Sequence, residues 1–327
     1  MPHSTVVITS DNLFREINAA FQKTYRDVVG RSANLSNCMR LGVPSSKRTE
    51  YFGYLESPPK LSRLDRGESV TEDAFKAISY SVENLTWAAS IGYYEDDLED
   101  MSTLDLREHA RQLARRAASL PEQVFFQILT GSSNPSLLKS IPTAPDGAAL
   151  FATTAGGSNR FGVANGNLLT GSGVASGAAV RGDFWSAIEQ AMLFQDTAGE
   201  PLLEPGVVDA GVTVVFGAGN MEAFQQAFKQ TITLNSAGVS NTILEGYGGN
   251  VTVWPTSRIT DNDFYVFFGS DALQRPVFET MRQAPRLFDE DRSNSERARR
   301  QRIFSTILDM RSGFGVNLPY GAVKINN

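Results

Sequence analysis

The chain has 327 residues, of which 41% are hydrophobic and 20% are charged, and its formal net charge is −6. This composition excludes a disordered chain, and the length is enough for one large or two medium domains. The chain has a single cysteine, which excludes internal disulfides. One cysteine and two histidines in the whole sequence are too few ligands for a structural zinc site. The acidic balance argues against a dedicated nucleic-acid-binding domain, because phosphate binding needs clustered lysine and arginine.

No apolar run approaches the roughly 20 residues needed to span a bilayer, and the first residues lack a basic region followed by an apolar one. We therefore expect neither membrane insertion nor secretion, and we expect the protein in a cytosol-like compartment.

The first predicted element is a helix over residues 11–29, where apolar residues recur at helical spacing behind a candidate cap at Ser10 or Asp11. Residues 30–50 are polar and contain two glycines and a proline. This composition predicts an extended arm rather than packed structure.

Between Thr49 and Ile91, two stretches of near-alternating apolar and polar residues flank a polar segment. The pattern predicts two long antiparallel strands joined by a wide loop. Pro58 and Pro59 confine the first strand to an edge or a bulge. A long hairpin with exposed apolar positions is an aggregation hazard in a monomer unless another chain covers it.

A long helix is predicted over residues 102–130, about 40 Å in length at 1.5 Å per residue. Its apolar stripe consists of Leu106, Ala110, Leu113, Ala117, Leu120, Val124 and Ile128. Residues 119–122 match a capping box that contains Pro121. We therefore expect the helix to kink or to restart at this proline.

Residues 131–182 are rich in small and polar residues, which predicts surface loops with ordered positions at Phe151 and Phe161. Beyond them, helices and strands alternate, as in a mixed α/β region. We expect helices over 182–196, with Asp183 as N-cap, and 220–230, and strands over 212–216, 250–254 and 264–268. In the tail we expect a strand over 302–310, a glycine-marked turn and a short strand over 322–325.

Two glycine-rich segments resemble phosphate-binding loops. Residues 171–177 follow a stretch too short and polar for a buried strand, so a flexible loop is favoured. Residues 217–220 join a strand to a helix, but they lack a third glycine and a following ribose-binding acid. A tight turn capped by Asn220 is favoured there, and we expect no cofactor. His109 belongs to no recognisable catalytic triad, and no nucleophile motif supports a hydrolase.

The acidic residues 95–100 could hold Mg²⁺ for phosphoryl chemistry, or a divalent ion shared between subunits. They also precede the long helix, whose start negative charge stabilises, and we favour this interpretation. The basic run of Arg297, Arg299, Arg300 and Arg302 could contact nucleic acid or an acidic patch of a neighbouring chain, or form a solvated face.

Several segments occur in a recognisable order. They are TEYFGYL from Thr49, a proline-containing strand, YSVENLTW from Tyr80, the acidic EDDLED, and a long helix with a proline before its apolar end. Near the C-terminus follow RPVFETMRQAP and RSGFGVNLPYGAVKI. Together these segments resemble the Mu-like bacteriophage major head subunit family.

The resemblance implies an α+β fold of the Hong Kong 97 type. The implied parts are an N-terminal arm (1–48), an E-loop hairpin (49–95), a peripheral domain with a long spine helix (96–144), an axial domain (145–272), and returning peripheral strands (273–327). It also implies a major capsid protein that assembles into pentamers and hexamers of an icosahedral phage shell around double-stranded DNA, and no enzyme activity.

The implied partners are other copies of the chain, a portal, possible decoration proteins and non-specifically contacted DNA. A separate scaffold protein is expected, because no acidic helical extension precedes the arm. The implied location is the virion capsid, assembled in the host bacterial cytoplasm. A nanocompartment shell of the encapsulin type is the alternative, and a divalent-metal phosphotransferase using Asp96, Asp97 and Asp100 is a remote one.

Candidate assembly contacts are charged residues of the hairpin, the acidic cluster and the basic run, together with one tryptophan. They are Arg63, Arg66, Trp87, Glu95, Asp96, Asp97, Asp100, Arg299 and Arg300. No residue is assigned to a catalytic, cofactor or metal site.

Overall fold

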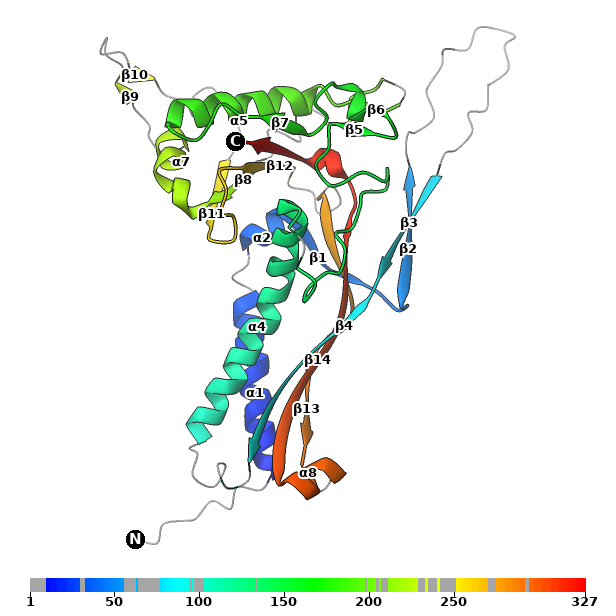
Figure 1. The fold of residues 1–327 in the computed structure, drawn as a ribbon, viewed down its shortest axis with the longest axis vertical. Helices are drawn as coiled ribbons and strands as arrows, with labels where there is room; N and C mark the ends of the chain where they lie inside the picture. The colour runs from blue at the N-terminus through cyan, green and yellow to red at the C-terminus, as the bar shows by residue number, and fades with distance from the viewer. Residues whose placement is uncertain are drawn as a thin grey trace.

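Two β-sheets organise the chain. One hydrophobic core underlies the first sheet and continues under one face of the second, and another core lies on the opposite face of the second sheet. Figure 1 shows the computed structural model, in which one sheet forms a long stem and the second lies at one end of it. The structure describes residues 10–29, 33–55, 63, 77–94, 96, 103–132, 134–197, 199–203, 206, 211–228, 233–234, 240–241, 251–269, 275–291 and 294–327.

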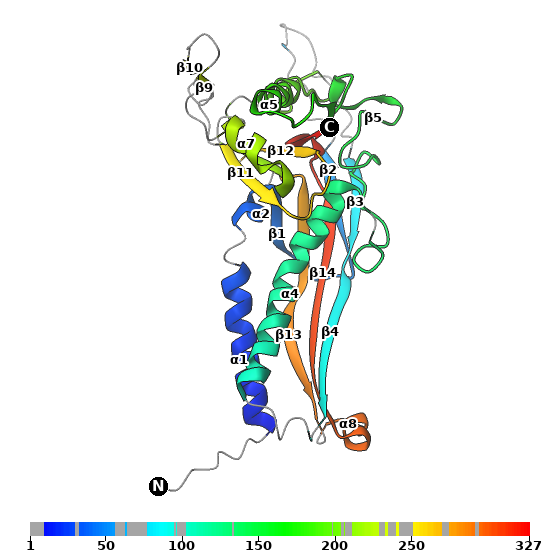
Figure 2. The same cartoon turned by 60° about the vertical axis from the view of Figure 1, so that its left-hand side comes forward.

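The stem sheet has four strands and is covered on one face by two helices. The strand order is β1 (Met39–Pro44), β13 (Val277–Glu290), β14 (Ile303–Val316) and β4 (Leu85–Tyr94). β1 is parallel to β13, whereas the other neighbours are antiparallel. Helices α1 (Ser10–Val29) and α4 (Thr103–Thr130) pack against each other along the stem (Figures 1 and 2).

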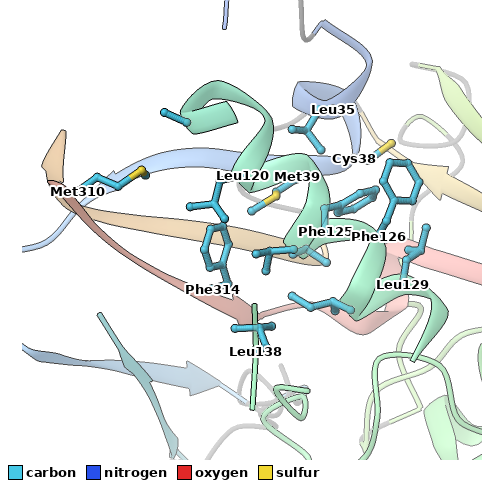
Figure 3. Packing of buried hydrophobic residues seen from close by; sticks show 14 of the residues in the cluster. Leu35, Cys38, Met39, Leu120, Phe125, Phe126, Leu129, Leu138, Met310 and Phe314 are labelled. Carbon is cyan, nitrogen blue, oxygen red and sulfur yellow. The ribbon is translucent and has the colours of Figure 1, made fainter. Parts of the chain in front are cut away.

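The stem core lies between α4 and the sheet. All seven apolar positions of the stripe predicted for α4 are buried. Figure 3 shows Leu120, Phe125 and Phe126 of α4 near Met39 of β1 and Phe314 of β14. Each large aliphatic or aromatic side chain buried in this way contributes about 1.5–3 kcal/mol, so the stripe fixes α4 to the sheet.

Helix α4 continues through Pro121. Proline has no N–H, so the carbonyl of Ala117 lacks its usual helical partner. The buried residues Leu120 and Val124 flank the proline and pack into the same core. The expected restart is therefore wrong, because packing on both sides of Pro121 holds one helix.

The second sheet, which we call the head sheet, has five strands. Their order is β11 (Val251–Thr256), β8 (Val212–Gly217), β12 (Phe264–Phe268), β15 (Ala322–Asn326) and β7 (Leu168–Thr170). Helices α5 (Gly177–Met192) and α7 (Met221–Phe228) pack on this sheet and on each other. Because β15 pairs with both β12 and β7, the C-terminal strand lies inside the head sheet.

A two-stranded hairpin projects beside the stem (Figure 1). Its strands β2 (Thr49–Leu55) and β3 (Ala77–Glu83) pair antiparallel from Thr49↔Glu83 to Leu55↔Ala77. At its base, Phe52 and Tyr80 meet the ring of Phe278 edge-on, at centroid distances of 5.0 and 6.5 Å. Aromatic contacts therefore join the hairpin to β13.

The remaining elements are short. They are α2 (Ala33–Cys38), β5 (Thr154–Ala155), β6 (Ser158–Asn159), β9 (Thr233–Leu234), β10 (Ser240–Asn241), α8 (Glu296–Gln301) and the 3₁₀ turns Arg160–Gly162, Ala218–Asn220 and Pro319–Gly321.

Several predicted elements are confirmed. They include the helices over 11–29, 102–130 and 220–230, and the strands over 212–216, 250–254, 264–268 and 322–325. Apart from residue 133, which lies outside the described residues, the loops of 131–182 contain only short strands, a 3₁₀ turn and the start of α5. Phe151 and Phe161 are ordered by ring contacts with Tyr265 and Phe194, at 5.4 and 4.9 Å.

Two predictions for the N-terminal half are corrected. The segment 33–44 is not an extended arm, because α2 and β1 bury Leu35, Cys38 and Met39 in the stem core. The hairpin prediction is confirmed for β2 and β3 only. Residues 85–94, with Trp87 and Ile91, form β4 and pair with β14 instead.

Two predictions for the C-terminal half are also corrected. Helix α5 begins at Gly177 behind Ser176, which caps Ala179, while Asp183 lies within the helix. The tail strand is longer than predicted, because β14 continues through Gly313 to Val316, and the glycine-marked turn follows at Pro319–Gly321.

Candidate assembly surfaces

The hairpin exposes a large aromatic side chain. Tyr51 of β2 is 72% exposed, although tyrosine rings are usually at least half buried. At the hairpin base, the Glu50 carboxylate accepts hydrogen bonds from the backbone N–H of Lys47, the Ser45 hydroxyl and the Ser46 N–H, at 2.8–2.9 Å. These bonds, led by that from Lys47, lower the pKa of Glu50. The charged carboxylate thus fixes the turn that leads into the hairpin.

The hairpin and the acidic cluster are only partly described. Arg63 is exposed, whereas Arg66 lies outside the described residues. Of the acidic cluster, the structure describes Asp96 alone, and Glu95, Asp97 and Asp100 lie outside the described residues.

Asp96 and the basic run meet at the far end of the stem. The carboxylate of Asp96 lies 3.7 Å from an Nη atom of Arg302. Both side chains are mostly exposed, so the pair contributes little to stability. The structure therefore brings one member of each predicted charged group together on the surface.

The rest of the basic run belongs to α8. Ser295 caps this helix, Arg297 bonds to Gln301 and Arg300 pairs with Glu296. Arg299 and Arg300 are exposed, as a solvent-facing or partner-facing patch requires. These arginines are available to a neighbouring chain at the end of the stem.

Trp87 differs from the charged candidates because it is half-buried in the stem. Its Nε1 donates a hydrogen bond to the Ser312 carbonyl at 3.2 Å, and its ring lies edge-on to Phe314 with centroids 6.1 Å apart. In the free subunit its contacts hold β4 against β14.

Neither glycine-rich segment offers a free anion-binding loop. The backbone N–H and hydroxyl of Ser172 donate to the carboxylate of Asp183, and the Gly173 N–H donates to Asn327. The segment is thus tied to α5 and to the chain end. A side chain at Gly217 would lie 2.8 Å from the Ile259 carbonyl, which explains a glycine at this turn without any ligand.

His109 packs against the sheet instead of facing a nucleophile. Its Nδ1 lies 2.8 Å from the Tyr93 hydroxyl, and the two rings stack with centroids 5.7 Å apart. Among the described residues, no group of three His, Cys, Asp or Glu side chains could hold a metal ion. No helix in the described part of the chain is long and apolar enough to cross a membrane.

Two buried polar groups escaped the sequence reasoning. Glu279 of β13 is 1% exposed, under α1 and beside β1. Arg160 is 2% exposed, and it donates to Asp146 at 2.7 Å and to the Leu150 carbonyl at 2.9 Å. Neither position stands out in the sequence, because each charge lies among residues that give no sign of its burial.

One family of known proteins matches part of the chain. The sequence model of the family "Mu-like prophage major head subunit gpT" matches residues 11–153, which contain α1, the hairpin, β4 and α4. A search of curated proteins finds no match.

Solved capsid structures share the fold at low sequence identity. A solved structure from Mycobacterium phage Patience has a TM-score of 0.56 at 13% identity, covering 98% of this chain and 90% of its own. The bacteriophage PhiM1 mature capsid has a TM-score of 0.56 at 10% identity, with coverages of 89% and 85%. The capsid of an empty GTA particle has 0.56 at 12%, with 91% of each chain covered. Residues 11–153 therefore resemble the Mu-like prophage major head subunits, and the chain as a whole has the Hong Kong 97-type fold of phage capsid proteins.

Proposed function

We propose that copies of this chain assemble into the pentamers and hexamers of an icosahedral shell that encloses double-stranded DNA. The observation that carries the proposal is the projecting hairpin β2–β3, whose Tyr51 is 72% exposed. An isolated two-stranded hairpin is at best marginally stable in water, so a neighbouring subunit is the natural surface for it. Obligate interfaces of this kind bury thousands of Å² and need no catalytic step.

The proposed shell gives each part of the chain a place. Residues 1–48 would form the N-terminal region, of which α1, α2 and β1 pack on the stem. Within 49–95 the E-loop would be the hairpin β2–β3, because β4 belongs to the stem sheet. Residues 96–144 would form the peripheral domain with its spine helix α4, 145–272 the axial domain, and 273–327 the returning peripheral strands except β15, which joins the head sheet. The arrangement of a stem sheet and a head sheet supports a division into two main parts.

The proposed partners follow from a closed DNA-filled shell. They are other copies of the chain, a portal, a separate scaffold protein and decoration proteins, with assembly in the host bacterial cytoplasm. The net charge of −6 favours a wall that contacts packaged DNA only weakly and non-specifically. Arg63, Arg66, Trp87, Glu95, Asp96, Asp97, Asp100, Arg299 and Arg300 are proposed contacts between subunits.

Electron microscopy of the purified protein tests this function. The chain is expressed alone and with its neighbouring head genes, and the product is examined by gel filtration and negative-stain microscopy. We expect closed, shell-sized particles. A monomer at high concentration under both conditions, with no particles in the micrographs, would contradict the proposal.

A further inference from the structure

In the part of the chain that the structure describes, the far half of the stem sheet has two edges without a partner strand. β1 pairs with β13 only as far as Met281, so beyond this residue the sheet consists of β13, β14 and β4. One edge is the outer side of β13 and the other is the outer side of β4. An unpaired strand edge presents backbone N–H and C=O groups to any other strand.

The β13 edge carries the features that prevent strand addition. Pro285 lacks an N–H, and the pairing register with β14 shifts between Met281 and Arg286. Arg282 and Arg286 are exposed on the same stretch. Proline, irregular register and charge each discourage a further strand, so this edge is protected.

The β4 edge has none of these features. Its ten residues, LTWAASIGYY, include no charge and no proline. They pair with β14 in unbroken register from Leu85↔Ser312 to Tyr94↔Ile303. In the described part of the chain only β14 pairs with β4, and Figure 2 shows β4 at the outer margin of the stem. A long, regular and uncharged edge is a template for another strand.

The surface beside this edge is shaped to receive side chains. A hollow of about 200 Å³ lies over β4 and β14, with small residues Ser90, Gly92 and Ser305 among those that line it. Tyr94, Ile303 and Ile307 add apolar surface, and Glu290 and Arg297 add opposite charges. Because both signs lie at one hollow, a second copy can place its arginine near this glutamate and its glutamate near this arginine.

We propose that the outer edge of β4 accepts a strand from a second copy of this chain and so extends the stem sheet across the interface between two subunits. The proposal rests on the proposed shell, which supplies many copies at high local concentration. Strand pairing is made by main-chain hydrogen bonds and needs no particular side chains. Because β4 carries no charged residue, the incoming strand need not carry a complementary charge. The self-complementary charges at the hollow favour this chain over an unrelated partner.

Hydrogen exchange measures the pairing directly. In the free subunit, the β4 amides that face away from β14 should exchange quickly, whereas in assembled particles they should become protected. Residues 283–290 on the protected β13 edge are the internal control, and their exchange should not change. Particles in which β4 exchanges as fast as in the free subunit would overturn the inference but leave the shell intact.

Charged substitutions in β4 provide a second test. Ala88→Lys with Ser90→Lys places charge on exposed positions of β4, and the matched control is Ala284→Lys, exposed on β13. We expect the β4 variant to need about tenfold more protein for assembly and the control to behave as wild type. Protection of β4 only after another protein is added would overturn the second copy as partner. A chain that forms no particles would overturn both the shell and this inference.

Discussion

Glu279 is the residue at which charge and burial conflict most. Its side chain lies 1% exposed between α1 and β1, and its Oε1 has no hydrogen-bond partner. Burial raises the pKa of Glu279 to about 7, against a smaller opposing effect of a hydrogen bond from the Gly42 N–H. Burial, followed by the charge of Glu279, raises the pKa of the facing Tyr25 to about 12. The neutral carboxyl is therefore the form that suits the folded stem.

This pKa predicts that the subunit loses stability as the pH rises. The folded state binds the Glu279 proton more tightly than the unfolded state, so the stabilisation is complete below pH 4.5 and is lost as the pH rises through about 7. A shift of this size corresponds to about 3 kcal/mol in the free energy of unfolding. Urea unfolding of unassembled subunits between pH 5 and 8 measures it.

Glu279→Gln should flatten this dependence, because the amide does not titrate. The exposed Glu189→Gln is the matched control and should keep the wild-type slope. If the free energy of unfolding changed equally with pH in wild type and Glu279→Gln, the Glu279 carboxyl would not be the source of the pH dependence.

At the scale of elements, the local sequence pattern predicts only those helices and strands that local packing determines. The stripe of α4 was readable because its seven apolar residues all face one core. The strand β1 was not readable, because its partner β13 lies more than 200 residues away and only the pairing makes a strand of MRLGVP. The hairpin prediction is correct for β2 and β3, which pair and are near neighbours in sequence. It is wrong for β4, which pairs with β14.

Among the candidate sites, charge was visible in the sequence, but exposure was not. The basic run was recognised as a surface group, and Arg299 and Arg300 are indeed exposed. Tyr51 was included in the alternating pattern without any sign that it faces outward, because period-two alternation does not say which face the fold covers. The open edge of β4 depends on strand order, which no single segment encodes.

The glycines of β14 illustrate the same limit and yield a prediction. Gly313 lies within β14, where a Cβ would lie 2.6 Å from the Glu83 carbonyl and 2.9 Å from Val82. The glycine thus lets β14 pass close to the hairpin base. We expect Gly313→Ala to destabilise the subunit by about 1–3 kcal/mol through this clash, measured by chemical unfolding.

The control for this effect is Gly53→Ala in β2. No atom lies within 4 Å of a Cβ built at Gly53, and its backbone is not left-handed. The control should be neutral or slightly stabilising. If Gly313→Ala were equally well tolerated, the close approach of the strands would not limit this position.

On the scale of the whole molecule, the structure combines well-filled cores with surfaces that make little sense for an isolated chain. The stem and head cores are built like those of a soluble domain. The hairpin, the edge of β4 that no described strand pairs with, and the exposed rings of Tyr51 and Tyr94 lie outside them. In a monomer such surfaces promote aggregation, whereas in a capsid protein they form interfaces between subunits.

Adjacent residues of β2 separate these two roles. Consecutive side chains of a strand point to opposite faces, so Tyr51 faces outward while Phe52 packs against Phe278 at 5.0 Å. Phe52→Ser should lower the free energy of unfolding of the subunit by about 2–4 kcal/mol through loss of that packing. Tyr51→Ser should change it by less than about 0.5 kcal/mol, because an exposed ring contributes little to folding.

Assembly should respond to Tyr51 even though folding does not. If a neighbouring subunit covers the hairpin, Tyr51→Ser removes buried aromatic area from every interface of the shell, and particle yield at a fixed protein concentration should fall. Sedimentation with negative-stain microscopy measures the yield, and urea unfolding of the same preparations confirms that the subunit is intact. Wild-type yield from Tyr51→Ser would mean that the exposed ring stays in solvent after assembly, and the hairpin contacts would then have to involve its other face.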